Sequence, residues 1–293
     1  MTQAQRIGFI GLGMMGTPMT ACLAKAGFEL FLADADAGRL RDVQANLNAS
    51  ALTAENAKSL DILITMLPNS DIVEHVLLGE NGWAASLAPQ AVVIEMSSSE
   101  PARSRELGQR LKTLNLHYLD APVSGGVKRA VDGSLAILVG GDAEVLQRCR
   151  PVLDAMGKNI LHIGDAGSGH AAKALNNFVS AAGLMATVEA LHVAKRFGID
   201  PGVMVDVLNA SSGGSNTSLN KARQFMLSGT FGSGFSMQLM NKDLKIAKGL
   251  SDALDYPMLF GQSAIKVWND VAQDATPATD HTEMYRMLAR EGE

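Results

Sequence analysis

The sequence is poor in cysteine and has no cluster of positive charge. Its 293 residues include two cysteines, Cys22 and Cys149, which lie far apart in segments predicted to be helical. A disulfide framework is therefore not indicated, and we expect a reducing, cytoplasmic location. The net charge is −5 and no basic run has the length of a nucleic-acid patch, so we expect neither DNA nor RNA as a partner.

Long uncharged apolar runs are also missing, and we expect no membrane partner because no stretch reaches the length of a spanning helix. The segment after Arg6, IGFIGLGMMGTPMTACLAKAG, has some likeness to a signal peptide. The glycines of GLGMMG weaken an apolar helix there, however, and they have a better interpretation below. Hydrophobic residues make up 47% of the chain and charged residues 19%, which indicates a folded globular protein.

Short apolar runs alternate with helical segments up to about residue 165. The runs predict buried strands because they are apolar on both faces, as a sheet covered on both sides requires. Strands that alternate with helices form βαβ units and a mostly parallel sheet. The predicted strands are residues 6–13, 28–34, 60–69, 91–97, 116–125, 134–141 and 159–167.

The pattern changes near residue 165, after which we predict no further strand. Residues 168–197 predict one long helix that ends before Gly198, and shorter helices follow, broken at SSGGSN and SGTFGSGF. We therefore predict an α/β domain with a doubly wound sheet at residues 1–165. An all-helical domain is predicted at residues 166–293, and the long helix joins the two.

The hexapeptide GLGMMG places Gly11, Gly13 and Gly16 in a G-x-G-x-x-G pattern between a predicted strand and a predicted helix. The first glycine permits a tight turn, the second lets the backbone approach a pyrophosphate, and the third lets helix and strand pack closely. The phosphates would meet the free N–H groups of the helix N-terminus. The pattern predicts a Rossmann-type dinucleotide site; the alternative is a turn with purely structural glycines.

An acidic residue, Asp34, ends the second predicted strand, eighteen residues after Gly16. A carboxylate at this distance binds the adenosine ribose hydroxyls of NAD. Asp34 and Asp36 together should repel the 2′-phosphate of NADP, so the sequence favours NAD as the cofactor. Arg39 and Arg41 follow and could attract that phosphate, which keeps NADP open, although a solvated helix face also explains them.

The segment DAPVSGG, residues 120–126, ends another predicted strand, at the edge where open α/β sheets bind ligands. Backbone N–H groups around Ser124, Gly125 and Gly126 can form a concavity for an anion. A small carboxylate substrate would suit that concavity. An ordinary glycine turn explains the same residues.

Lys173 and Asn177 lie one helical turn apart in GSGHAAKALNNF, at the start of the predicted long helix. The residues around Lys173 are mostly small and uncharged. A buried lysine can serve as a general acid or base, and an asparagine can orient a hydroxyl or carbonyl. The alternative is a lysine whose alkyl chain lies along a helix surface.

Other chemistries find no support. The six histidines show no metal-ligand spacing such as H-E-x-x-H, so no metal is expected. No G-x-S-x-G segment is present, so a hydrolase triad is not indicated. His170 precedes Lys173 by three residues, and His281 lies in DHTEMYRML; each either borders a site or is a polar structural residue.

Taken together, these motifs resemble those of the β-hydroxyacid dehydrogenase family, which includes 3-hydroxyisobutyrate dehydrogenase and tartronate semialdehyde reductase. The resemblance extends along nearly the whole chain, with the motifs in the same order. The segments that carry it are GFIGLGMMGTPM, ITMLPNSD, EMSSSEP, DAPVSGG, GSGHAAKALNN and FSMQLMNKDLKIA.

The resemblance implies an active site in a cleft between the two domains. Lys173 matches the catalytic lysine, Asn177 the asparagine that positions the substrate, and residues 124–126 the segment that binds its carboxylate. It also implies a homodimer or homotetramer whose contacts come from the helical domain. The residues expected to bind the dinucleotide are Gly11, Leu12, Gly13, Met14, Met15, Gly16, Asp34, Leu67, Pro68, Ser98 and Lys242.

The activity implied is hydride transfer between NAD(P) and a small β-hydroxyacid, similar to 3-hydroxyisobutyrate or to serine, threonine, threonate or glycerate. One alternative is a reductase of tartronate semialdehyde or succinic semialdehyde, and another is a dinucleotide-binding scaffold without catalysis. Imine reductases usually replace the lysine, and 6-phosphogluconate dehydrogenase is much longer. Glu95 and Ser98 stand where the family usually reads DMST, and SSGGSNTS and DHTEMYR also depart from the usual 3-hydroxyisobutyrate enzyme. The sequence therefore does not identify the acid.

Overall fold

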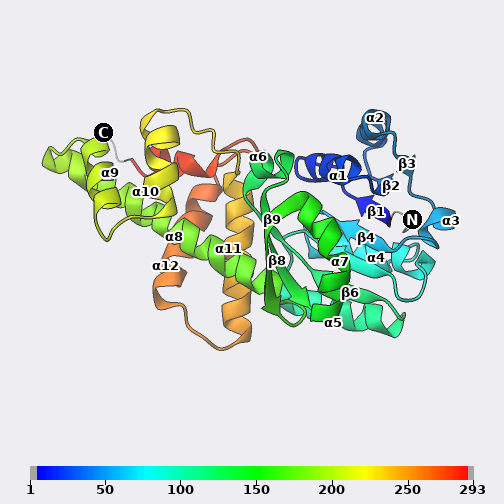
Figure 1. Cartoon of the computed structure of the whole chain (residues 1–293). Coiled ribbons are helices and arrows are strands. Elements are labelled where there is room, and N and C mark those ends of the chain that lie inside the picture. Colours follow the sequence, from blue (N-terminus) through cyan, green and yellow to red (C-terminus); the bar gives the residue numbers. More distant parts are fainter. Residues whose placement is uncertain (1–4, 290–293) are drawn as a thin grey trace. The chain divides into compact units, whose positions relative to one another are not determined.

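A computed structural model describes residues 5–289 of the chain (Figure 1). The chain divides into two compact units, the first ending at Lys173 and the second beginning at Ala174. The first unit contains the β-sheet, and the second contains helices.

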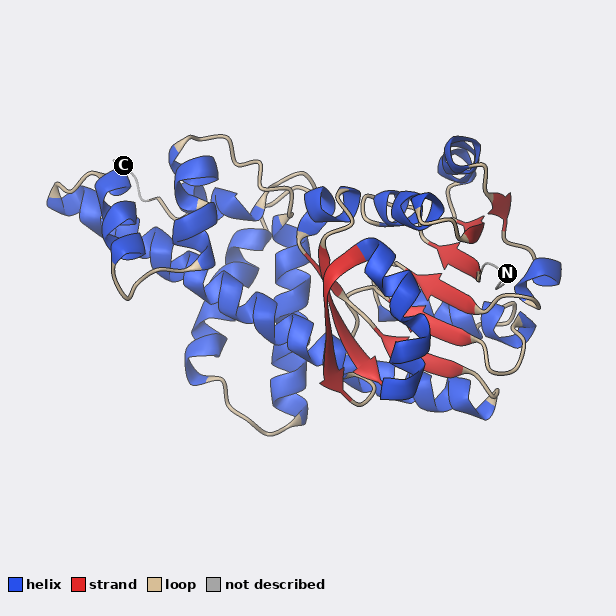
Figure 2. Ribbon diagram, in the orientation of Figure 1, coloured by secondary structure: helices blue, strands red, loops and turns tan. Residues whose placement is uncertain are grey.

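The strands of the described residues form one sheet in the order β3-β2-β1-β4-β5-β6-β8-β7, with β9 paired to β8 (Figure 2). The pairs from β3 to β6 are parallel, whereas β8 runs antiparallel to β6 and β7. The strands are β1 (Arg6–Ile10), β2 (Glu29–Ala33), β3 (Ser50–Ala51), β4 (Ile62–Thr65), β5 (Val92–Glu95), β6 (His117–Asp120), β7 (Val123–Ser124), β8 (Leu135–Gly141) and β9 (Gly157–Gly164).

The strand order reverses between β1 and β4, which lie side by side although β2 and β3 come between them in the chain. The chain therefore leaves the carboxyl ends of these two strands in opposite directions. In open α/β sheets, such a reversal opens the crevice in which ligands bind. The predicted doubly wound sheet is confirmed, and its reversal marks the edge where a cofactor site is expected.

One predicted strand is wrong in detail. Residues 116–125 form two short strands, β6 and β7, with Ala121 and Pro122 between them. Proline has no N–H to donate to a ladder, so a strand does not continue through it in the middle of a sheet. The second piece, β7, pairs antiparallel with β8, which also makes this end of the sheet less parallel than predicted.

Helices cover both faces of the sheet. Successive residues of a strand point to opposite faces, so Ile62 and Ile64 belong to one hydrophobic core while Leu63 belongs to the other. The first core includes residues of α1 (Gly16–Lys25), α2 (Ala37–Leu47), α6 (Gly126–Val131) and α7 (Ala143–Met156). The second includes residues of α3 (Ala54–Ala57), α4 (Ser70–Leu78), the 3₁₀ turn η1 (Trp83–Ser86) and α5 (Pro101–Thr113).

The long helix α8 spans Ser168–Phe197, with the bounds predicted from the sequence. It ends at Gly198, whose φ of +95° suits glycine and closes the helix. By length and composition this helix could cross a membrane, so the expectation that no stretch has such a length is wrong. However, 44% of the helix's most apolar stretch is buried in the protein, and the core helix of a soluble protein can have the same length and composition.

The second unit is helical, as predicted, and its breaks fall at the expected segments, residues 211–215 and 228–236. Its core surrounds Trp268, which is fully buried and donates from its indole nitrogen to the Ala181 carbonyl oxygen at 3.4 Å. After α8 come α9 (Pro201–Ala210), α10 (Asn216–Asn220), the π-helix η2 (Ala222–Leu227), α11 (Met237–Ala253), α12 (Leu259–Ala272), the 3₁₀ turn η3 (His281–Glu283) and α13 (Met284–Met287).

Candidate active site

The glycine loop joins β1 to α1, and its three glycines have different environments. A side chain on Gly11 would collide with the Met66 carbonyl oxygen, and φ at Gly11 is +99°. One on Gly16 would collide with the Gly11 carbonyl oxygen. A side chain on Gly13 would meet no atom within 4 Å. The fold itself therefore requires Gly11 and Gly16, whereas Gly13 leaves open space beside the N-terminus of α1, where a pyrophosphate fits.

Asp34 is held rigidly beside this loop. Its Oδ2 accepts from the Leu12 N–H at 2.6 Å and its Oδ1 from the Asp36 N–H at 2.8 Å. The Arg39 guanidinium lies 3.6 Å from Asp34 and 3.6 Å from Asp36. The carboxylate at the end of β2 thus has a fixed orientation suited to ribose hydroxyls. The Arg39 guanidinium also lies close to the place that the 2′-phosphate of a bound NADP would occupy.

Other residues expected at the cofactor lie at the same sheet edge, because β1, β4 and β5 are adjacent and parallel. The Leu67 N–H donates to the Ser97 hydroxyl at 2.9 Å, which ties the loop after β4, including Pro68, to the loop after β5 that carries Ser98. Leu12 is fully buried, and its N–H donates to Asp34 while its carbonyl oxygen accepts from the Thr17 hydroxyl, so its role in the loop is structural. Met14 is exposed, whereas Met15 packs against the core.

Residues 124–126 link β7 to the short helix α6. Gly125 and Gly126 have φ values of +130° and +69°, which glycine adopts readily. A side chain on Gly125 would collide with that of Arg129, whereas one on Gly126 would meet nothing within 4 Å. The segment therefore has the left-handed backbone and the open side that an anion concavity needs.

Lys173 lies in the second turn of α8 and its residue is only 8% exposed. A lysine whose ammonium group rests in solvent at a helix surface would be far more accessible. His170, one turn earlier, and Asn177, one turn later, are also buried. The structure thus gives α8 a row of buried polar residues in an otherwise small and apolar sequence.

Asn177 is bound to a residue that sequence reasoning missed. Its Nδ2 donates to Oδ2 of Asp243 on α11 at 2.5 Å, and Asp243 is 3% exposed. Lys242 Nζ lies 3.9 Å from Oδ1 of the same carboxylate. Asp243 directly follows Lys242 in NKDL, but nothing in that local spacing indicates a partner 66 residues away. The carboxylate fixes the asparagine amide in one orientation.

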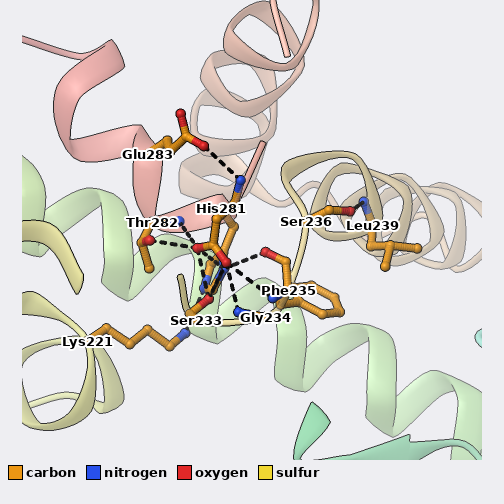
Figure 3. A network of polar contacts seen from close by, with 10 residues as sticks. Lys221, Ser233, Gly234, Phe235, Ser236, Leu239, His281, Thr282 and Glu283 are labelled. Atoms are coloured by element: carbon orange, nitrogen blue, oxygen red, sulfur yellow. Dashed lines mark hydrogen bonds and ion pairs between the residues drawn. The ribbon is translucent and has the colours of Figure 1, made fainter. Parts of the chain in front are cut away.

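His281, which is buried, belongs to a second polar network together with the partly buried Lys221 (Figure 3). Its Nδ1 lies 2.9 Å from the Phe235 carbonyl oxygen, which can only accept, so Nδ1 carries the hydrogen. Its Nε2 lies 3.0 Å from Lys221 Nζ. Burial lowers the pKa of Lys221, and Asp280 opposes that shift. Sequence reasoning missed Lys221, which follows SSGGSNTSLN directly.

Asp280 holds this network together. Its carboxylate accepts from the Ser233 hydroxyl, from the Gly234 N–H and from both the N–H and the hydroxyl of Thr282. Burial raises the pKa of Asp280, but the hydrogen bonds outweigh burial and hold that pKa well below its usual range. Asp280 also caps η3. The segments SSGGSNTSLNK, SGTFGSGF and DHTEMYR therefore meet in one network.

Comparison with known proteins shows the family. A profile of the NAD binding domain of 6-phosphogluconate dehydrogenase matches residues 6–164, and one described as NAD-binding of NADP-dependent 3-hydroxyisobutyrate dehydrogenase matches residues 167–288. The chain is 37% identical over 251 residues to 2-(hydroxymethyl)glutarate dehydrogenase of Eubacterium barkeri, covering 84% of this chain and 82% of that protein. It is 35% identical over 289 residues to 2-hydroxy-3-oxopropionate reductase of Escherichia coli, covering 97% of each.

Among solved structures, 3-hydroxyisobutyrate dehydrogenase of Mycobacterium tuberculosis with L-serine superimposes with a TM-score of 0.91 and 31% identity, over 98% of this chain and all of that one. The chain belongs to the β-hydroxyacid dehydrogenase family. It is an oxidoreductase that acts on the CH–OH group of hydroxyacids and uses NAD.

The different environments of Gly13 and Gly16 predict different effects of the same substitution. Gly16→Ala should lower the melting temperature markedly, because its Cβ collides with backbone. Gly13→Ala should leave the melting temperature unchanged and weaken NADH binding about tenfold or more, since its Cβ enters the open space. Thermal unfolding and fluorescence titration with NADH measure the two effects. Equal NADH affinity in Gly13→Ala and wild type would contradict the assignment.

Asp34→Asn should move the cofactor preference toward NADP. The amide oxygen can still accept from the Leu12 N–H, while the charge that repels a 2′-phosphate is gone and Arg39 remains. We expect the NADP to NAD ratio of kcat/KM to rise at least about tenfold, the factor that corresponds to ~1.4 kcal/mol. Asp42→Asn, an exposed position on α2, is the matched control and should leave the ratio unchanged.

Proposed function

We propose that the chain oxidises a small β-hydroxyacid reversibly with NAD, with Lys173 as the general acid and base. The observation that carries the proposal is the burial of Lys173 on α8, one turn before Asn177, whose amide Asp243 holds in place. A buried amine next to an oriented amide can both exchange a proton with a substrate hydroxyl and fix that hydroxyl's position.

NAD, when bound, supplies the hydride acceptor. In oxidation, neutral Lys173 accepts the proton of the substrate hydroxyl at Nζ; in reduction, its ammonium form returns that proton to the carbonyl oxygen. Asn177 orients the reacting oxygen. The backbone N–H groups of residues 124–126 hold the carboxylate, so the substrate is fixed at two points.

We propose an acid of the 3-hydroxyisobutyrate, serine, threonine, threonate or glycerate kind, or a dicarboxylic relative such as 2-(hydroxymethyl)glutarate. The related proteins named above support this range, because their names give 2-(hydroxymethyl)glutarate, 2-hydroxy-3-oxopropionate and 3-hydroxyisobutyrate as substrates. The alternative, physiological reduction of a semialdehyde, uses the same residues in the opposite direction.

The deciding experiment follows nicotinamide absorbance with purified protein. The hydroxyacids would be tested with NAD and NADP, and the corresponding semialdehydes with NADH. Turnover with one acid would identify the substrate class, and faster turnover with a semialdehyde would favour the reductase. No turnover on either set, by protein shown to bind NADH, would contradict the proposed substrate range.

Lys173→Ala tests the mechanism. General acid–base catalysis contributes roughly a hundred- to ten-thousand-fold, so kcat should fall by about that factor. The Kd for NADH should stay within about twofold, because Lys173 acts on the substrate. Lys248→Ala is the control: Lys248 lies on α11, paired with Asp252 at 2.6 Å and half exposed. Near-normal turnover in Lys173→Ala would contradict the proposed mechanism.

Both cysteines are free, and neither is activated. Burial raises the pKa of Cys149 to about 12 and also raises the pKa of Cys22. Thiols that stay protonated are poor nucleophiles and resist oxidation. The scarcity of cysteine and the absence of a disulfide between the two cysteines support our proposal that the protein works in a reducing compartment, the cytoplasm.

We further propose a homodimer or larger homo-oligomer that uses the second unit. Exposed apolar side chains there include Val193 and Phe197 on α8 and Val203 on α9, with exposures of 68%, 83% and 54%. Contiguous exposed apolar patches often mark protein–protein contacts, and we propose that these side chains belong to one. Light scattering after gel filtration should give a dimer or larger species. Val193→Lys with Phe197→Lys should shift it to monomer, and a monomeric wild type would contradict the proposal.

A further inference from the structure

A buried polar cluster lies at the start of α8, within the first unit. Its central residues are Glu95 at the end of β5, Asp120 at the end of β6 and His170 on α8, exposed by 0%, 0% and 1%. Two serines, Ser97 and Ser104, complete it. Burying two carboxylates and an imidazole costs desolvation energy that an apolar trio would avoid, so their arrangement calls for a reason.

Asp120 anchors the backbone of the first turn. Its Oδ1 accepts from the Gly167 N–H at 2.7 Å and its Oδ2 from the His170 N–H at 2.9 Å. The first N–H groups of a helix have no partner within the helix, and its N-terminus carries partial positive charge. The carboxylate satisfies both needs and fixes where α8 begins relative to β6.

The His170 ring fixes the same turn from the side. Its Nε2 lies 3.1 Å from the Ser97 carbonyl oxygen, which can only accept, so Nε2 carries a hydrogen. Oε2 of Glu95 lies 3.1 Å from the same nitrogen. The ring's Nδ1 lies 2.7 Å from the hydroxyl of Ser104, on α5. The ring is therefore held on both edges.

Glu95 connects the ring to the cofactor edge of the sheet. Its Oε1 accepts from the Ser97 N–H at 2.9 Å, and the Ser97 hydroxyl accepts from the Leu67 N–H. Ser97 thus contacts His170 through its carbonyl oxygen and the loop after β4 through its hydroxyl. Any rotation of the first turn of α8 would disturb the loop that carries Ser98.

We infer that His170, held by Glu95 and the Ser97 carbonyl oxygen, is a positioning residue for Lys173. This inference rests on the proposed role of Lys173. Residues three apart on a helix lie one above the other on nearly the same face. Asp120 fixes the start of the helix, and the ring removes the remaining freedom to rotate about the helix axis. Together they set where the Lys173 amine points.

The test compares His170→Gln with His170→Asn, two amides of different reach. The glutamine amide nitrogen can take the place of Nε2, next to the Ser97 carbonyl oxygen and Glu95. The shorter asparagine reaches only the position of Nδ1, near Ser104. Misplacement by about 1 Å can cost ~100-fold in rate. We expect kcat of His170→Asn to fall about 100-fold and that of His170→Gln to stay within about threefold of wild type.

The readouts separate positioning from stability. The Kd for NADH and KM for the best acid should change little in either variant, and melting temperatures show whether both fold. Equal kcat in the two variants would overturn the inference, whether or not they are less stable than wild type. A fall in kcat that only follows a loss of folded protein, as shown by NADH-binding capacity, would also overturn it.

A double variant links the effect to Lys173. If His170 acts through Lys173, His170→Asn combined with Lys173→Ala should be no slower than Lys173→Ala alone. A further loss of about 100-fold would show that His170 acts in another way. The two proposals can be contradicted separately. Full turnover in Lys173→Ala would contradict the role of Lys173 as general base. If Lys173→Ala is inactive but His170→Asn keeps the wild-type kcat, only the positioning role of His170 is contradicted.

Discussion

The site depends on one contact, that of the Asp120 carboxylate with two N–H groups at the start of α8. A buried carboxylate is tolerated only where donors replace the water it has lost. The helix start offers such donors and is itself in need of an acceptor. Because each side satisfies the other, the end of β6 determines where α8 begins. Lys173 lies in the second turn of the helix, so its position follows from the end of β6.

The cofactor edge follows from a different constraint, the reversal of strand order between β1 and β4. The glycine loop must turn within a space bounded by the Met66 carbonyl oxygen, which leaves no room for a side chain on Gly11. Gly16 is needed for the next close approach. Only Gly13 is left without a structural reason to be glycine, and a ligand that needs the space supplies one. Asp34 completes the loop by accepting its Leu12 N–H.

Features that depend on neighbours in the sequence could be predicted. The bounds of α8 follow from an uninterrupted helical composition and from Gly198, and the roles of the GLGMMG glycines follow from their place between strand and helix. The division of residues 116–125 into two strands at Pro122 could also be predicted, because proline has no N–H to donate to a neighbouring strand. Pairs far apart in the chain could not be predicted: Asn177 meets Asp243 across 66 residues, and Lys221 meets His281 across 60. Local spacing carries no information about such partners.

The Lys221–His281 network also restrains the helix that carries Asp243. Asp280 binds the N–H groups of Gly234 and Phe235, and Ser236, the next residue, caps α11. Asp243 lies seven residues after that cap, about 10 Å along a rigid helix. A substitution at His281 would loosen the segment before α11, residues 233–236, and so alter the position of Asp243 without contacting it. Because Asp243 accepts from the Asn177 amide, the three segments of this network are linked to Asn177 through α11.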